Sequence, residues 1–532
     1  MQRSIARLLG WGLIGILLLN LLAACSAIGN VGDQIGQIVS RSGAPLRLSG
    51  EEPDTLDPAV AQDSTSWGYL LEIYGGLVRL DSQLKVVPDL ASSWTVGSDG
   101  RTYTFHLREN AKFQDGRPIT AADVKYSLER ALDPATRSPV ASIYLGDIVG
   151  SQARLSGQAK DVSGIVVVDP LTLRITIDAP KSYFLSKLTY PTAFVVDRRN
   201  VESGPTWFQH PNASGPYSLG SWQPGQKIVL RRNPNYAGNA PHLNEVDYDL
   251  SGTSPFTLFQ EGKLDVATLG IGDVPRASDP TGPYHQDLIS TPLMSFWYLG
   301  FNINQKPFDD PKVRLAFAYA TDKKKLVDGL FRGTRTIANG VLPPGMLGFD
   351  QSYAGIPYDP ATGRQMLRES SYGSATNLPP IVSTVGQDAG QIGEGFAEMY
   401  HNNLGVNITV EQDQTSFLSN LGKHQLQMFY IGWVADYPDP EDFLGVLFSG
   451  TSQGNDTGYN QSQVNTILAQ ASAETNPQKR GALYGQANAL VVEAAPAIPL
   501  FFDTEYDLVR PSVRGLTITP LGIVSFVGVQ VQ

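Results

Sequence analysis

The sequence predicts an α/β protein that is built from two or three lobes. Its 532 residues exceed what a single hydrophobic core usually organises. Strand and helix signals are mixed along the chain, and both ends of the globular part are rich in strand signals. Hydrophobic residues make up 42% of the chain and charged residues 17%, which is typical of a globular protein rather than a disordered one.

The composition argues against several classes of function. A formal net charge of −11 and the lack of any basic run disfavour a nucleic-acid partner, because a phosphate backbone requires concentrated Lys and Arg. The single cysteine rules out an intrachain disulfide. The six histidines have no HxxxH spacing and there is no CxxC, so no zinc site is indicated. We expect no cofactor and no metal.

The first 24 residues predict a secretory signal peptide. Arg3 and Arg7 precede an apolar stretch over residues 8–22, and two alanines stand before Cys25. The string Leu-Ala-Ala-Cys resembles the bacterial lipobox, in which the cysteine is acylated and becomes the first residue of the mature chain. An uncleaved membrane anchor is the alternative, because the apolar stretch approaches the length that a bilayer core requires.

Residues 25–44 predict a lipidated, flexible tether. Glycine recurs there among Ser, Asn and Gln, a composition that behaves as a flexible coil. Several acyl chains together bind a membrane firmly. The expected location is therefore extracytoplasmic, with a lipid anchor in the cell membrane, in the periplasm or on the outer surface. The globular part is expected to begin near Pro45.

The clearest local signals follow each other in the first quarter of the chain. Residues 102–107 alternate between apolar and polar side chains, which predicts a half-buried strand. Thr120 and Asp123 resemble a capping box at the start of an amphipathic helix over residues 121–132. Val124, Leu128 and Ala131 share one stripe of this helix and are its expected core face.

Further elements are predicted along the rest of the chain. Strands are expected at residues 165–168, 173–177, 215–222, 227–233, 295–304, 497–502 and 513–519. A helix is expected at residues 310–321, with Asp310 as the cap and Pro311 in its first turn. No repeat of 20 to 50 residues is visible, which disfavours a solenoid or a propeller.

Five strings occur in an order that resembles a known family. The longest is residues 86–134, with Pro-x-Leu-Ala-x-Ser-Trp at its start and a Thr-Ala-x-Asp-Val helix near its end. The other four strings are residues 54–58, 214–236, 301–322 and 432–444. Together they resemble the peptide/nickel-class solute-binding proteins, family 5, of ABC transporters, which include dipeptide- and oligopeptide-binding proteins. The resemblance runs from about Pro53 to about Gly515.

The resemblance implies a two-lobed periplasmic-binding-protein fold of the class II, or cluster C, type, with an extra inserted domain and a hinge between the lobes. On that template the chain divides into a signal peptide at 1–24, a lipidated tether at 25–44, lobe I at 45–75, 187–295 and 501–532, an inserted domain at 76–186, and lobe II at 296–500.

The resemblance also implies a site for a ligand ammonium. In peptide-binding relatives an aspartate in a Gly-Trp-x-x-Asp-Tyr-like string of the second lobe holds this group. Here the string starts at Gly432, so Asp436 is the expected ammonium partner, Trp433 a pocket wall and Tyr437 a further ligand-binding residue. The alternative is a purely structural turn, in which Asp439 or Asp442 caps the next helix.

Other expected ligand-binding residues come from two further segments. Gln62 and Asp63 fall where relatives pair the ligand backbone with the cleft edge, and Trp297, Tyr298 and Asn302 lie at the expected lobe crossing. For the two aromatic residues of this set, core packing is an equal alternative.

Two features leave the ligand open. The partner of a ligand carboxylate is undecided, with Lys423 and His424 as isolated candidates. Val140 stands where some oligopeptide-binding relatives have an aromatic residue that packs on the ligand's N-terminus, and it cannot stack. The ligand site is then roomier, or the ligand is not an ordinary peptide.

The resemblance implies a substrate-binding lipoprotein of an ABC import system. It is expected to be a monomer that captures di- or oligopeptides in a cleft between the lobes and delivers them to permease and ATPase subunits. No GxSxG, Walker A or HExxH string indicates an enzyme. The alternatives are the same fold binding a nickel chelate or an oligosaccharide, a ligand sensor and, more distantly, a secreted hydrolase.

Overall fold

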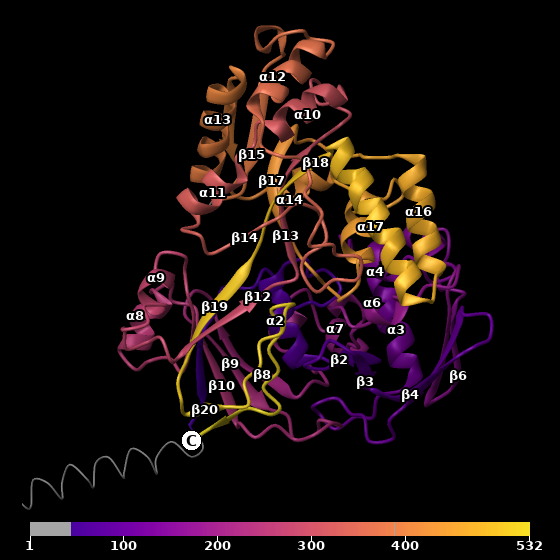
Figure 1. Cartoon of the computed structure of the whole chain (residues 1–532). Helices are drawn as coiled ribbons and strands as arrows, with labels where there is room; N and C mark the ends of the chain where they lie inside the picture. The colour runs from indigo at the N-terminus through magenta and orange to yellow at the C-terminus, as the bar shows by residue number, and fades with distance from the viewer. Residues whose placement is uncertain (1–43, 388) are drawn as a thin grey trace, which may run out of the picture.

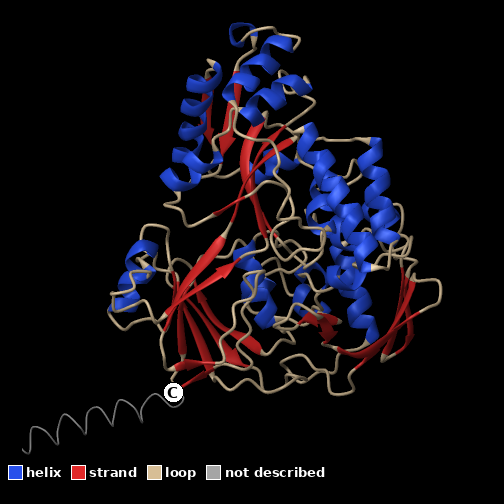
Figure 2. Cartoon of the chain, viewed as in Figure 1, coloured by secondary structure: helices blue, strands red, loops and turns tan. Residues whose placement is uncertain are grey.

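The structure is a computed structural model that describes residues 44–387 and 389–532. The predicted signal peptide, Cys25 and nearly all of the predicted tether lie outside the described residues. Two large sheets organise the described chain, and helices pack around both of them (Figures 1 and 2). We call the body around the first sheet lobe I and the body around the second lobe II.

The sheet of lobe I has seven strands and collects distant parts of the chain. Its strand order is β12-β19-β11-β1-β10-β9-β8. The strands are β1 (Leu46–Ser49), β8 (Tyr217–Gln223), β9 (Lys227–Arg232), β10 (Glu245–Asp249), β11 (Val266–Thr268), β12 (Leu288–Pro292) and β19 (Thr504–Val509). Helix α2 (Ser64–Ile73) belongs to this lobe and buries Leu70 and Ile73 in its core.

The sheet of lobe II has six strands in the order β14-β18-β13-β17-β15-β16. They are β13 (Ser295–Phe301), β14 (Thr336–Ile337), β15 (Ile381–Val385), β16 (Ile408–Gln412), β17 (Met428–Val434) and β18 (Ala497–Phe502). The longer helices of this lobe are α10 (Pro311–Tyr319), α11 (Lys323–Leu330), α12 (Pro360–Glu369), α13 (Gly390–Leu404), α16 (Ser462–Ala473) and α17 (Pro477–Ala494). Its shorter elements are α14 (Phe417–Gly422), the π-helical turn η4 (Glu441–Gly445) and α15 (Val446–Phe448).

The chain passes between the two sheets in two short extended segments. One joins β12 to β13 and the other joins β18 to β19. Strand β18 runs to Phe502, and β19 begins at Thr504 in the other sheet. Two adjacent strand-like connections suit a hinge, because few residues have to change conformation when the lobes move.

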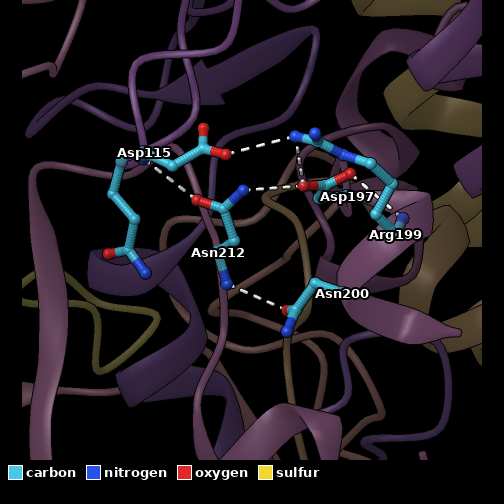
Figure 3. Close-up of a pocket in the computed structure, with 6 residues that line it drawn as sticks. Asp115, Asp197, Arg199, Asn200 and Asn212 are labelled. Carbon is cyan, nitrogen blue, oxygen red and sulfur yellow. Dashed lines mark hydrogen bonds and ion pairs between the residues drawn. The ribbon is translucent and has the colours of Figure 1, made fainter. Parts of the chain in front are cut away.

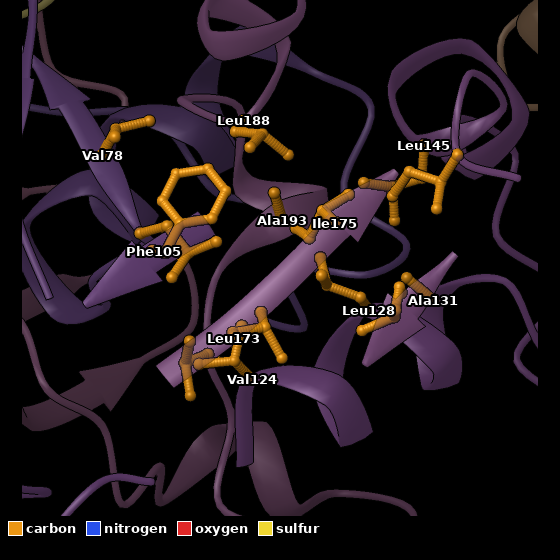
Figure 4. Close-up of a cluster of buried hydrophobic side chains, with 14 of the residues drawn as sticks. Val78, Phe105, Val124, Leu128, Ala131, Leu145, Leu173, Ile175, Leu188 and Ala193 are labelled. Atoms are coloured by element: carbon orange, nitrogen blue, oxygen red, sulfur yellow. The ribbon is translucent and has the colours of Figure 1, made fainter. Parts of the chain in front are cut away.

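A third, smaller sheet forms the core of the inserted segment. Its strands are β4 (Ala91–Val96), β5 (Thr102–Leu107), β6 (Ile165–Asp169) and β7 (Thr172–Thr176), in the order β4-β5-β7-β6. Helix α3 (Ala121–Ala131) begins with the predicted capping box and covers this sheet. Its stripe of Val124, Leu128 and Ala131 is buried against Leu173 and Ile175 of β7, as Figure 4 shows.

The inserted domain is fastened to lobe I by ion pairs. Arg130 of α3 donates to both carboxylate oxygens of Asp57. Arg117 bonds Asp197, and Asp197 is also bonded by Asn212 at 2.7 Å. A surface hollow next to these groups, lined by Asp115, Asp197, Arg199, Asn200 and Asn212, is drawn in Figure 3. Its side chains bond one another, so this hollow is best explained as part of the fastening.

Most of the predicted elements are confirmed. The strand at 102–107, the hairpins at 165–177 and 215–233 and the strand at 497–502 are present with shifts of one or two residues. The predicted strand at 295–304 ends at Phe301, and the helix predicted at 310–321 covers Pro311–Tyr319 with Asp310 as its cap. The strand predicted at 513–519 is wrong beyond Arg514, because only β20 (Val513–Arg514) has a partner strand, β21 (Gln530–Val531).

Candidate functional site

Asp436 lies at the edge of lobe II that faces lobe I. It follows β17, whose last residue is paired with the first residue of β13. The Ala435 N–H donates to the carbonyl of Met294 at 2.8 Å, which ties this segment to the crossing between the lobes. The Asp436 N–H donates to the Asp442 carboxylate at 2.8 Å. The backbone therefore fixes where Asp436 stands.

The side chain of Asp436 meets the inserted domain. Tyr144 on α4 (Ala141–Leu145) donates its hydroxyl to the Asp436 carboxylate. The Tyr144 ring stacks on Tyr190, with centroids 3.8 Å apart and planes 10° apart. Trp67 of α2 lies 5.9 Å from Tyr190, centroid to centroid. Three parts of the molecule, lobe I, the inserted domain and lobe II, thus meet beside one carboxylate.

Asp436 and Asp442 form a pair of carboxyl groups that, within the described part of the chain, makes no ion pair with a Lys, Arg or His side chain. Burial raises the pKa of Asp436 to about 7, and the hydrogen bond from Tyr144 opposes this rise. Burial and the charge of Asp436 raise the pKa of Asp442 well above its usual range. Among the described residues, no lysine, arginine or histidine lowers the pKa of Asp436. This arrangement suits a ligand that brings its own positive charge.

Trp433 and Tyr437 are built into the same turn. Trp433 donates its indole N–H to Asp442 at 3.1 Å, and part of its ring remains exposed. Tyr437 is fully buried, packs into the hydrophobic cluster of the inserted domain and donates its hydroxyl to Glu441. Trp433 thus lies next to the Asp436–Asp442 pair, whereas Tyr437 packs between lobe II and the inserted domain.

A second group of buried charges lies at the same interface. Lys187, at the end of α6 (Phe184–Lys187), contacts Asp147 of the inserted domain at 3.2 Å and Glu441 of lobe II at 3.6 Å. Burial alone would lower the pKa of Lys187, but the charges of Glu441 and Asp147 outweigh it and raise the pKa. Lys187 supplies the positive charge for both acids of this group, so the group does not need a cationic ligand.

Gln62 and Asp63 stand at the start of α2. Gln62 is exposed. Asp63 caps the helix by accepting the Ser66 N–H at 2.7 Å, and its other carboxylate oxygen is buried without a protein partner. The same helix carries Trp67, which reaches Tyr190, so the structure brings this segment to the aromatic side of the site.

The structure does not join Trp297 and Tyr298 of β13, or Asn302 just after this strand, to Asp436. Trp297 stacks on Tyr430 and Phe501, and Tyr298 stacks on Phe296. Both rings pack within lobe II, as the alternative of core packing predicted. Asn302 is buried and donates to the carbonyl of His424 at 2.8 Å, which holds a turn.

The candidates for a ligand carboxylate lie on the surface of lobe II. Lys423 and His424 are both exposed, and Lys423 bonds Ser419 at 2.9 Å. Val140 lies in the core of the inserted domain, directly before α4. Tyr144, four residues later on α4, lies beside Asp436, but its ring is buried against Tyr190.

Sequence reasoning missed Tyr144, Tyr190, Trp67 and Lys187, and it considered Asp442 only as a helix cap. Helical spacing offers one usable signal, because Tyr144 follows Val140 by four residues and residues at that spacing share a helix face. The remaining contacts join segments far apart in the chain, such as Tyr144 and Asp436, which are 292 residues apart.

Among residues 44–387 and 389–532, no group of three or more His, Cys, Asp or Glu residues is arranged so that it could hold a metal ion. Within the same residues, no helix has the length and apolar character needed to cross a bilayer.

Comparison with curated proteins finds relatives that span nearly the whole chain. The oligopeptide-binding protein OppA of Bacillus subtilis is 27% identical and is matched over 97% of this chain and 98% of its own length. The dipeptide-binding protein DppE of the same organism is 29% identical, with 89% of each chain matched. The glutathione-binding protein GsiB of Salmonella typhimurium is 31% identical over 88% of this chain and 91% of its own length.

Solved structures resemble the fold over its full extent. The murein tripeptide binding protein MppA of Escherichia coli superposes with a TM-score of 0.82 at 27% identity and covers 92% of this chain and 98% of its own. OppA of Burkholderia pseudomallei gives a TM-score of 0.81 at 25% identity, with 92% and 99% covered. The predicted two-lobed periplasmic-binding-protein fold is confirmed. The family description "Bacterial extracellular solute-binding proteins, family 5 Middle" matches residues 85–455, and the chain belongs to this family.

Proposed function

We propose that this chain is the substrate-binding lipoprotein of an ABC import system and that it captures peptides at the junction of its lobes. One observation carries the proposal: Asp436 lies at this junction, bonded by Tyr144 and adjacent to Asp442, and none of the described basic residues lowers its pKa. A ligand ammonium would supply the positive charge at this carboxylate.

The relatives favour a peptide as the ligand. Their names give an oligopeptide, a dipeptide and glutathione as ligands. These molecules share a free amine, which matches the acid that the structure leaves without a cation. A peptide would therefore place its ammonium on Asp436, next to the stacked rings of Tyr144 and Tyr190 and the exposed part of Trp433.

The protein is proposed to act outside the cytoplasm and to work with membrane subunits. The chain is monomeric, is exported through its signal peptide and is acylated at Cys25. It delivers its ligand to permease and ATPase subunits. Mass spectrometry of the protein extracted from membranes is expected to find an acylated Cys25 as the first residue.

The test of the binding site is calorimetry with alanine peptides of two to five residues and with glutathione. The Asp436→Ala variant is expected to bind at least about tenfold more weakly than the unchanged protein, since a charge-assisted hydrogen bond contributes about 1.5–3 kcal/mol. Asp350→Ala, at an exposed turn of lobe II where the carboxylate bonds Ser352, is the matched control. Equal affinity of the Asp436 variant and the control would contradict the assignment.

A further inference from the structure

Among the described residues, Tyr144 is the side chain of the inserted domain that hydrogen-bonds the Asp436 carboxylate. Tyr144 is only 1% exposed and is held flat against Tyr190, so its hydroxyl has little freedom to move. Asp436, which receives that hydroxyl, stays partly exposed. A ligand can therefore approach the carboxylate while Tyr144 stays in place.

The hydroxyl of Tyr144 acts on the charge of the carboxylate as well as on its position. A hydrogen bond donated to a carboxylate favours its ionised form, whereas burial and a second acid favour the protonated form. At Asp436, burial raises the pKa and favours the protonated form, whereas the hydrogen bond from Tyr144 lowers the pKa and favours the ionised carboxylate. An ammonium binds tightly only to the ionised form, so this balance decides how well the site works.

The other charged and titratable groups around Asp436 do not replace this contribution. Asp442 and Glu441 of η4 are themselves acids with raised pKa values. Burial, together with the carboxylates of Asp436 and Asp63, raises the pKa of Tyr190. The nearby cation, Lys187, contacts Glu441 and Asp147 rather than Asp436.

We infer that Tyr144 is a positioning residue of the ammonium site: its hydroxyl aims the Asp436 carboxylate and keeps it ionised for the ligand. This inference rests on the proposed function. It also means that the two halves of the ammonium site come from different domains, so that the site is complete only when lobe II meets the inserted domain.

The test compares the Tyr144→Phe variant with the unchanged protein between pH 6 and pH 8. The same alanine peptides and glutathione serve as probes in calorimetry. The quantity of interest is the ratio of the two dissociation constants at each pH, because titration of the ligand's own amine affects both proteins equally and cancels. Tyr183→Phe is the matched control, since Tyr183 also crosses from the inserted domain to lobe II but bonds the Ser472 hydroxyl at 2.9 Å.

The expected ratio for Tyr144→Phe depends on pH. If the lost hydrogen bond raises the pKa of Asp436 by about one unit, the variant binds roughly tenfold more weakly at pH 6 and less than about twofold more weakly at pH 8. The Tyr183→Phe ratio is expected to stay constant across the same range.

A Tyr144→Phe ratio that does not change with pH, whether it equals one or not, overturns the inference, because a loss of packing alone has no reason to follow the titration of Asp436. Failure of the proposed function gives a different result. In that case no probe binds, or Asp436→Ala binds as tightly as the unchanged protein at every pH.

Discussion

Two groups of buried and half-buried acids lie at the interface between the inserted domain and lobe II, and only one of them contains a cation. The Lys187 cluster, made of Lys187, Asp147 and Glu441, contains a cation between its two acids. The Asp436 cluster, made of Asp436, Asp442 and Tyr144, contains two acids and a hydroxyl. Buried charges are costly unless they are paired. We propose that the first cluster serves the fold and that the second receives a charged ligand.

Removing the cation of the Lys187 cluster is expected to have the largest effect on stability. Lys187→Met removes the cation that contacts Glu441, whereas Asp147 keeps its ion pair with Lys181, and breaking a buried pair in this way costs about 3–5 kcal/mol. Denaturant unfolding measures the loss. Lys160→Met, at an exposed lysine of the inserted domain, is the control, and a loss below about 1 kcal/mol for Lys187→Met would show that the cluster does not hold the domains together.

Neutralising Asp436 is expected to increase the stability of the ligand-free protein, whereas removing Lys187 decreases it. Burial raises the folded-state pKa of Asp436 from 3.8 to about 7. Between these values the unfolded chain is ionised at this residue and the folded chain is protonated, so the contribution of Asp436 to stability falls as pH rises and levels off above about 7.

Asp436→Asn removes this dependence while it keeps an acceptor for Tyr144. Without ligand, the variant is expected to be more stable than the unchanged protein by at least ~1 kcal/mol at pH 8, with a smaller difference at pH 5. Thermal unfolding at both pH values provides the measurement. A variant that is less stable at pH 8 would mean that Asp436 already has a partner within the protein.

The smallest effect is expected at Asp442. Burial and the charge of Asp436 raise the pKa of this carboxyl well above its usual range, which favours its protonated form, and Asn retains an oxygen that can accept from the Asp436 N–H and from Trp433. Asp442→Asn is therefore expected to change peptide affinity by less than about threefold. A loss of tenfold or more in calorimetry would show that Asp442 is ionised and shares the ligand's charge.

The sequence was most informative where a signal depends on near neighbours. Helix α3 was predicted with its cap and its buried stripe because the capping box and helical periodicity involve residues three or four apart. The strand predicted at 513–519 failed beyond Arg514 because a strand also needs a partner, and for Val513 and Arg514 that partner is the short β21 near the end of the chain.

The site was predictable only in part for a similar reason. Asp436 and Trp433 were predicted as ligand-binding residues because they belong to one short string that resembles a family motif. Tyr144 and Tyr190 belong to other segments, and only folding brings them to Asp436. Trp297 and Tyr298 show the converse, because their place near the lobe crossing suggested a ligand role whereas their rings pack within lobe II.

The central claim is that the ligand supplies the cation that the Asp436 cluster lacks. It is tested most directly by calorimetry with an alanine peptide that binds and with its N-acetylated form, each measured on the unchanged protein and on Asp436→Ala. We predict that acetylation weakens binding to the unchanged protein at least about tenfold and has little further effect on the variant. If acetylation weakens binding to both proteins equally, the ammonium is held elsewhere and the claim is contradicted.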